Sequence, residues 1–244
     1  MHRLYACDDF FFDLGTGSGT AVRVLYEPTL FAGDPSMVEV FDTVFGDVFH
    51  RRRRVCTYVF ENDARYASRL TELEEKYRAR EWNMLFLAKE ASERRNATGD
   101  IVGEDFAKTF AMLTVHRTKS SRVVIKMDIE GREYLLLPWL FDSGLLCHEK
   151  VNTLLISWHD DGAESARQFQ KLFERLLDTQ ECDSTDVLTL SDEVEYVDVS
   201  DAEFVNNDNE LVSGTVSEGT LESGLNYSAW FTESRSAGAR EKSE

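Results

Sequence analysis

The sequence predicts an α/β fold, in which helices cover both faces of a mostly parallel sheet. Three observations support this fold class. Short apolar segments of strand length alternate with longer segments of helical periodicity, which is typical of repeated strand–helix–strand units. A glycine-rich turn directly follows the first apolar segment. Hydrophobic residues make up 42% of the 244 residues, enough for the large core that such a sheet needs.

Five strands and five main helices are expected in alternation. The strands are predicted at residues 10–12, 55–60, 83–87, 123–127 and 152–158. The helices are predicted at residues 36–50, 64–81, 105–116, 133–141 and 162–179. The fourth of these helices is expected to break near Pro138. Residues 187–190 and 194–199 are expected to form a terminal hairpin.

Acidic residues are concentrated in the C-terminal part of the chain. The net charge is −18, and from Thr179 onward 16 acidic residues stand against 3 basic ones. We expect one domain over residues 1–201 and a disordered acidic tail over residues 202–244. This charge argues against a nucleic-acid partner. Arg51 to Arg54 are interpreted as a solvated connection, and no apolar run reaches the roughly 20 residues of a membrane helix.

The four cysteines lie far apart and form no CxxC pair. Neither a structural zinc site nor a disulfide framework is therefore expected. Unpaired cysteines favour the cytoplasm. Glycosylation triplets at Asn96 and Asn226 suit the secretory pathway instead. The first strand lies so near Met1 that an N-terminal segment could be missing, and such a segment would also suit that pathway. The location is left open.

The glycine-rich turn indicates a ligand site at the carboxyl end of the first strand. Gly15, Gly17 and Gly19 let the backbone turn sharply and approach a ligand closely. Thr20 stands where a dinucleotide-binding loop has its third glycine. Asp13, two residues before the first glycine, favours a cationic ligand over a pyrophosphate. Alone, the loop is equally compatible with an ordinary glycine turn.

Glu61 strengthens the ligand interpretation. It closes the second predicted strand, where a carboxylate can accept hydrogen bonds from both hydroxyls of a ribose. The alternative is a capping role for the helix that follows Asn62. Together with the glycine loop, Glu61 favours a cofactor that contains a nucleoside.

The fourth predicted strand carries the most specific motif. The segment KMDIEGRE, residues 126–133, resembles the KxDxEGxE signature of the FkbM-type S-adenosylmethionine-dependent methyltransferases. FFFDLGTGSG, YVFEND and LLISWHD are similar to that family's first, second and fifth strand motifs, and the resemblance covers roughly residues 10–199. It implies a Rossmann-like class I methyltransferase fold and, for most members, methylation of hydroxyl groups on sugars or other natural products.

The resemblance also implies residue roles. The positions that match cofactor-binding ones are Asp13, Gly15, Thr16, Gly17, Gly19, Glu61 and Asn62, with Glu90 and Ala91 near the adenine. Asp128 and Glu130 would face the methyl-transfer centre, and Glu130 and Ser157 would contact the acceptor. The chain departs from the family in two places: Ser157 stands where a glutamate is usual, and residues 26–35 interrupt the usual first helix.

Asp128 and His159 are the candidate catalytic residues, because a general base near the acceptor hydroxyl would assist methyl transfer. Each has a structural alternative. Asp128 could belong to a helix-capping turn with Lys126 paired to a carboxylate, and His159 to a surface turn in which Asp160 or Asp161 caps a helix. Asp128, His159 and Asp160 offer ligands for a divalent ion, but nothing in their spacing demands one, so no metal is predicted.

The sequence therefore predicts an S-adenosylmethionine-dependent methyltransferase that modifies a hydroxyl on a glycan or small molecule. The alternative, motivated by Ser157, is a catalytically silent binding module with the same fold. An NAD-dependent oxidoreductase is disfavoured by the GxGxG spacing and by the distance from Asp13 to Glu61, since about 20 residues usually separate the loop from the acidic residue. The oligomeric state is left open.

Overall fold

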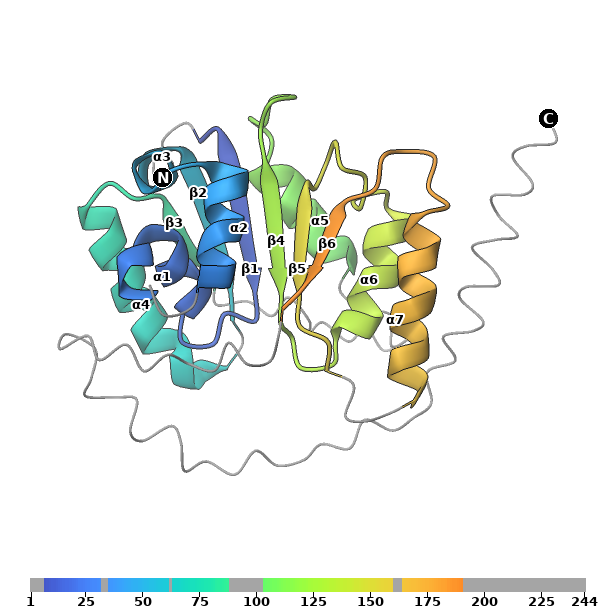
Figure 1. Ribbon diagram of the computed structural model, residues 1–244. Coiled ribbons are helices and arrows are strands. Elements are labelled where there is room, and N and C mark those ends of the chain that lie inside the picture. The colour runs from blue at the N-terminus through green and yellow to red at the C-terminus, as the bar shows by residue number, and fades with distance from the viewer. Residues whose placement is uncertain (1–6, 32–34, 62, 88–102, 160–163, 191–244) are drawn as a thin grey trace. The chain divides into compact units, whose positions relative to one another are not determined.

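A computed structural model describes residues 7–31, 35–61, 63–87, 103–159 and 164–190 (Figure 1). All of these residues belong to one compact unit, Met1–Glu195. The predicted acidic tail at 202–244 lies outside the described residues, so the domain boundary at residue 201 stays a prediction.

A six-stranded sheet forms the centre of the described part. Its strands are β1 (Asp9–Leu14), β2 (Val55–Phe60), β3 (Met84–Leu87), β4 (Val123–Met127), β5 (Thr153–Ile156) and β6 (Asp186–Thr189). They lie in the order β3-β2-β1-β4-β5-β6, and every neighbouring pair is parallel (Figure 1). The strand order reverses between β1 and β4, which is where open parallel sheets bind ligands. The α/β class and the parallel sheet are thus confirmed.

Helices cover both faces of this sheet. They are α1 (Thr20–Tyr26), α2 (Pro35–Phe45), α3 (Val48–Arg54), α4 (Ala64–Ala79), α5 (Gly103–Leu113), α6 (Glu133–Asp142) and α7 (Glu164–Leu177), with a 3₁₀ turn η1 (Pro28–Phe31). Successive side chains of a strand point to opposite faces. Accordingly, Phe11 packs against Phe41 of α2, whereas Phe12 packs against Phe106 and Phe110 of α5.

The single helix predicted at residues 36–50 is wrong, because α2 and α3 are separate helices. Gly46 ends α2 in the left-handed conformation with φ +80°. The side chain of Asp47 then caps α3 by accepting hydrogen bonds from the amides of Phe49 and His50. The helical spacing of apolar residues continues across Gly46 in the sequence. The last of these residues, Phe49, does not join the core, because its side chain is 74% exposed.

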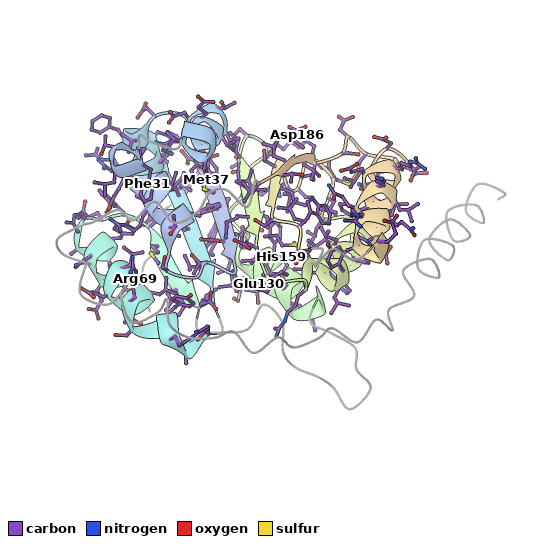
Figure 2. All side chains as sticks on the ribbon, turned by 60° about the horizontal axis from the view of Figure 1, so that its bottom comes forward. Phe31, Met37, Arg69, Glu130, His159 and Asp186 are labelled. Atoms are coloured by element: carbon purple, nitrogen blue, oxygen red, sulfur yellow. A yellow bond between two sulfur atoms is a disulfide. The ribbon has the colours of Figure 1, made fainter. Side chains whose placement is uncertain are left out.

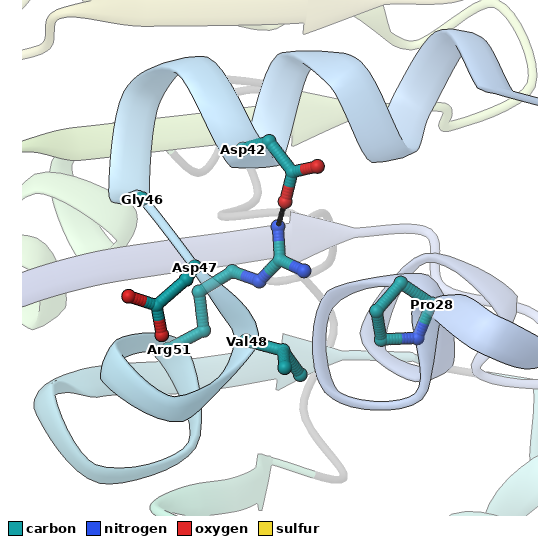
Figure 3. A pocket seen from close by; sticks show the side chains of 6 residues that line it. All are labelled: Pro28, Asp42, Gly46, Asp47, Val48 and Arg51. Carbon is teal, nitrogen blue, oxygen red and sulfur yellow. Dashed lines mark hydrogen bonds and ion pairs between the residues drawn. The ribbon is translucent and has the colours of Figure 1, made fainter.

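The interpretation of the arginine run as a solvated connection holds only for the solvent exposure of Arg53 and Arg54. The four arginines form the last turn of α3, and Arg51 is only 1% exposed because its guanidinium pairs with Asp42 of α2 (Figure 3). This pair borders a surface pocket lined by Pro28, Asp42, Gly46, Asp47, Val48 and Arg51. The pocket contains none of the predicted site residues, and its one cationic side chain is neutralised by a carboxylate.

One further expectation about an element needs correction, and another is described only in part. The helix at Pro138 does not break: α6 runs through it to Asp142, with buried leucines on both sides of the proline. The first half of the predicted terminal hairpin is β6, but it pairs in parallel with β5, so that Leu154 lies beside Val187. The second half, residues 194–199, lies outside the described residues.

All four cysteines are paired, contrary to the prediction. Cys7 is bonded to Cys56, and Cys147 to Cys182. The pairing of β1 with β2 brings the first two together, although 49 residues separate them in sequence. The second bond joins the segments that lead into β5 and β6. The sequence argument for a cytoplasmic location thereby loses its support, since disulfides persist mainly in oxidising environments.

None of the helices in the described ranges has both the length and the apolar character needed to cross a membrane.

Candidate functional site

The carboxyl ends of β1, β2, β4 and β5 meet at one edge of the sheet, the lower edge in Figure 1. Backbone hydrogen bonds continue past the strands and join the following loops. The amide of Gly15 donates to the carbonyl of Phe60 at 3.0 Å, and the amide of Asp128 donates to the carbonyl of Leu14 at 3.0 Å. This edge therefore brings together the glycine loop, Glu61 and the Asp128 segment, as the predicted order of motifs requires.

The glycine loop needs its glycines for two different reasons. Gly15, Gly17 and Gly19 all have positive φ angles, which side-chain-bearing residues rarely adopt. Gly15 in addition has no room for a side chain, because a Cβ there would lie 1.8 Å from the carbonyl oxygen of Asp128. The backbone of the β1 loop thus packs directly on the β4 loop at the point where strand order reverses.

Asp13 lies beneath this loop rather than on its surface. Its carboxylate is fully buried, accepts a 2.6 Å hydrogen bond from the Thr16 hydroxyl and lies 3.3 Å from the ammonium of Lys126. Thr16 is buried as well. In this structure both side chains hold the loop in place, and their direct contact with a cofactor stays a prediction.

Glu61 lies beside the loop and is partly exposed. One of its oxygens accepts a 2.8 Å hydrogen bond from the amide of Gly17, and the other accepts one from the amide of Asp63. Helix α4 is capped by Asp63 itself, whose carboxylate accepts from the amide of Arg65. Glu61 is therefore not the capping residue of that helix, and its carboxylate is oriented along the glycine loop.

Lys126 connects the two halves of the site. Its ammonium is buried and lies 3.0 Å from the carbonyl oxygen of Gly15 and 3.3 Å from a carboxylate oxygen of each of Asp13 and Asp128. Burial alone would disfavour the charge, but the two carboxylates outweigh it and raise the pKa of Lys126 above its ordinary value. The pairing of Lys126 with a carboxylate, which belongs to the structural alternative for Asp128, is thus present.

Asp128 and His159 contact each other across the ends of β4 and β5. The Nε2 atom of His159 lies 3.3 Å from the Oδ1 atom of Asp128. Partial burial of Asp128 opposes ionisation, but His159 and Lys126 together lower its pKa. Hydrogen bonds to Asp128 and then to Glu133 raise the pKa of His159 to about 10. At neutral pH the imidazole therefore holds a proton, which makes it a hydrogen-bond donor and a poor general base.

Glu130 and Glu133 complete this group of side chains. Glu130 is 88% exposed, and its carboxylate lies 3.6 Å from Nε2 of His159 (Figure 2). Glu133 is fully buried and accepts hydrogen bonds from both the backbone amide and Nδ1 of His159, at 2.9 and 3.1 Å. The sequence reasoning assigned Glu133 no role, although the last glutamate of the KxDxEGxE motif was the available signal.

The remaining predicted residues divide into two groups. Ser157 is buried at the end of β5, where its amide donates to the carbonyl of Met127. Five residues named above lie outside the described part of the chain: Asn62, Glu90, Ala91, Asp160 and Asp161.

No protein-family model, curated protein or solved structure matches this chain. The resemblance to the FkbM-type methyltransferases therefore rests on the motif residues and their order.

Proposed function

We propose that this chain binds S-adenosylmethionine at the carboxyl edge of its sheet and transfers the methyl group to a hydroxyl of a glycan or small molecule. The observation that carries the proposal is the meeting of the glycine loop with Glu61 and Asp128 at the reversal of strand order. A ligand in that position would contact the backbone of the glycine loop on one side and the carboxylates of Glu61 and Asp128 on the other.

The residues at this edge fit the proposed cofactor. The glycines let the loop turn sharply beside Glu61, whose carboxylate accepts a hydrogen bond from the Gly17 amide. The amide bonds from Gly17 and Asp63 orient the Glu61 carboxylate, which is the group that would accept hydrogen bonds from the ribose hydroxyls. The carboxylates of Asp128 and Glu130 favour a ligand that carries a positive charge, as a sulfonium does.

When bound, S-adenosylmethionine supplies an electrophilic methyl group, so that one O–C bond forms as one S–C bond breaks. The protein's main contribution is then to align the acceptor oxygen, which can be worth roughly 7–11 kcal/mol of the barrier. Asp128 would accept a hydrogen bond from the acceptor hydroxyl, whose proton would pass to solvent as the O–C bond forms. The lowered pKa of Asp128 makes it a weak base, so alignment of the donor and the acceptor would account for most of the rate enhancement. His159 keeps Asp128 in position by donating to it.

A silent binding module with the same site is the second candidate. Ser157 replaces the expected glutamate and is buried, and His159 is held as an imidazolium by its neighbours. The first observation removes a side chain that would hold the acceptor, and the second removes a candidate base. Neither affects the glycine loop. The third reading, NAD binding, keeps some support because the strand order is that of dinucleotide-binding sheets.

Calorimetric titration of the full chain with S-adenosylhomocysteine, S-adenosylmethionine and NADH separates these candidates. We expect micromolar affinity for the first two. Glu61→Ala should lose at least about tenfold in affinity, because two hydrogen bonds to a charged group are worth more than 1.4 kcal/mol. Glu72→Ala, which removes an exposed carboxylate paired with Lys76 on α4, is the matched control and should bind normally.

The absence of binding to folded protein would refute the proposal, and preferential binding of NADH would replace it with a dehydrogenase. Binding of S-adenosylmethionine without methyl transfer, tested across a panel of hydroxyl-bearing acceptors, would favour the silent module.

A further inference from the structure

Three potential metal-ligating side chains converge at the ends of β4 and β5. Asp128, Glu130 and His159 each offer one donor atom, and these atoms all lie within 4.8 Å of one another. Nε2 of His159 is 3.3 Å from the Asp128 carboxylate and 3.6 Å from the Glu130 carboxylate. Figure 2 shows Glu130 and His159 side by side at this edge of the sheet.

These separations match those between neighbouring ligands of one cation. A first-row divalent metal lies about 2.0–2.2 Å from nitrogen and carboxylate ligands, so adjacent donors in tetrahedral or octahedral geometry are roughly 3.0–3.6 Å apart. The two distances measured from the imidazole nitrogen lie in this interval. The two carboxylates lie within 4.8 Å of each other, and the exposed Glu130 side chain can rotate to bring its donor to a shared cation.

The buried Glu133 provides an independent indication of a prearranged ligand. It is 0% exposed, and its Oε1 atom accepts hydrogen bonds from both Nδ1 and the backbone amide of His159. This contact turns Nε2 toward the two carboxylates. Metal-binding histidines almost always give their other ring N–H to a carboxylate, a backbone carbonyl or water, which fixes the tautomer and the ring orientation.

The second oxygen of Asp128 is fixed in a similar way. Its Oδ2 atom lies 3.3 Å from the buried ammonium of Lys126, which leaves Oδ1 directed at the imidazole. Around Lys126 and His159 stand four carboxylates, so the group of side chains is strongly acidic and favours a divalent cation. These carboxylates belong to Asp13, Asp128, Glu130 and Glu133.

We propose that Asp128, Glu130 and His159 form a binding site for a divalent transition-metal cation of the Mn²⁺ class. Two carboxylates with one imidazole suit such an ion better than Ca²⁺ or Mg²⁺, which prefer all-oxygen ligand sets. Metal binding is independent of the proposed function. The bound cation would displace the proton from Nε2 of His159 and replace its contact with Asp128. Resting on that function, the cation would hold the acceptor hydroxyl beside the methyl donor and lower its pKa, in place of a strong protein base.

The test is titration of the chelator-treated full chain with Mn²⁺ alone, followed by the electron paramagnetic resonance signal of the free ion. We expect one high-affinity ion per chain in the wild type. Glu130→Gln should weaken that site at least tenfold without affecting the fold, since the Glu130 side chain is almost wholly exposed. His148→Ala removes an exposed histidine that lies 3.9 Å from Asp186, and this control should bind Mn²⁺ as the wild type does.

A pulsed spectrum of the Mn²⁺ complex supplies a second readout, because a coordinated imidazole adds a nitrogen coupling. We expect the coupling in the wild type and its absence in His159→Gln. Equal affinity in the wild type and Glu130→Gln, or no nitrogen coupling in the wild type, would overturn the proposal and leave His159 as an imidazolium held by carboxylates. Weak binding to the acidic C-terminal residues is common to all variants and cancels in the comparison.

The same samples are titrated with S-adenosylhomocysteine. Manganese binding without cofactor binding would refute the proposed function and leave the metal site intact, whereas cofactor binding without manganese binding would do the reverse.

Discussion

Replacement of Gly15 by alanine tests whether the loops after β1 and β4 pack backbone to backbone. Gly46 offers a matched control, because it too has a positive φ angle but has no atom within 4 Å of the position that a Cβ would occupy. Gly46→Ala should therefore cost only the left-handed conformation, about 1–2 kcal/mol.

Gly15→Ala should cost more, because two effects add. Its φ of +73° carries the same conformational penalty, and its Cβ would lie 1.8 Å from the carbonyl oxygen of Asp128, far inside contact distance. The Asp128 carbonyl cannot move away freely, since the amide of Asp128 donates a hydrogen bond to the carbonyl of Leu14. Forced repacking typically costs about 1–3 kcal/mol, so the total loss in the free energy of unfolding should be about 2–5 kcal/mol.

Urea denaturation of the full chain, followed by circular dichroism, gives both free energies. In thermal denaturation the Gly15→Ala loss corresponds to roughly 4–20 °C, at about 2–4 °C per kcal/mol for a domain of this size. If Gly15→Ala proved no more destabilising than Gly46→Ala, the close contact between the two loops would be refuted.

Three further predictions address the disulfides, the buried hydrogen bonds and the site's pH dependence. Cys147→Ser together with Cys182→Ser should lower the free energy of unfolding by about 4 kcal/mol for a loop of this length, measured in urea, and a thiol assay of the untreated wild type should find no free cysteine. Tyr26→Phe should cost about 1–3 kcal/mol in the same assay, because the buried hydroxyl contacts two backbone carbonyls and one side-chain hydroxyl; an unchanged midpoint would contradict those contacts. The pKa of His159 is raised from 6.5 to about 10, so its stabilisation should be complete below about pH 6.5 and lost as the pH rises through 10. In chelator-containing buffer the stability difference between wild type and His159→Gln should therefore shrink over that range by at least about 1 kcal/mol, allowing for solvent screening, and a constant difference would refute the raised pKa.

The strands were predictable because each buried strand has an apolar signal of its own. β2 and β4 coincide with the predicted segments, and the carboxyl-edge rule placed the glycine loop, Glu61 and Asp128 together before any contact was known. The break between α2 and α3 was missed because the apolar periodicity continues through Gly46. The helix ends there only because the backbone of Gly46 takes the left-handed conformation. Arg51 was misread because its partner, Asp42, lies on another helix and ion pairing between elements leaves no local pattern.

The inner layer of the site was less accessible to sequence reasoning. Beyond the place of Glu133 in the KxDxEGxE motif, nothing in the sequence indicates its contact with His159, since that contact depends on how α6 packs beside the end of β5. The cysteine pairs were hidden for a related reason. Strand pairing brings Cys7 and Cys56 together regardless of their distance along the chain. Sequence patterns identify the edge at which side chains gather, whereas the partners within that group depend on tertiary packing.

A crystal structure of the full chain soaked with S-adenosylhomocysteine tests the central claim most directly. We expect the ribose hydroxyls to lie within hydrogen-bond distance of the Glu61 carboxylate, and the sulfur to lie above the loop of Gly15 to Gly19, toward Asp128. Ligand density elsewhere on the molecule, or none at saturating concentration in crystals with an open carboxyl edge, would contradict it.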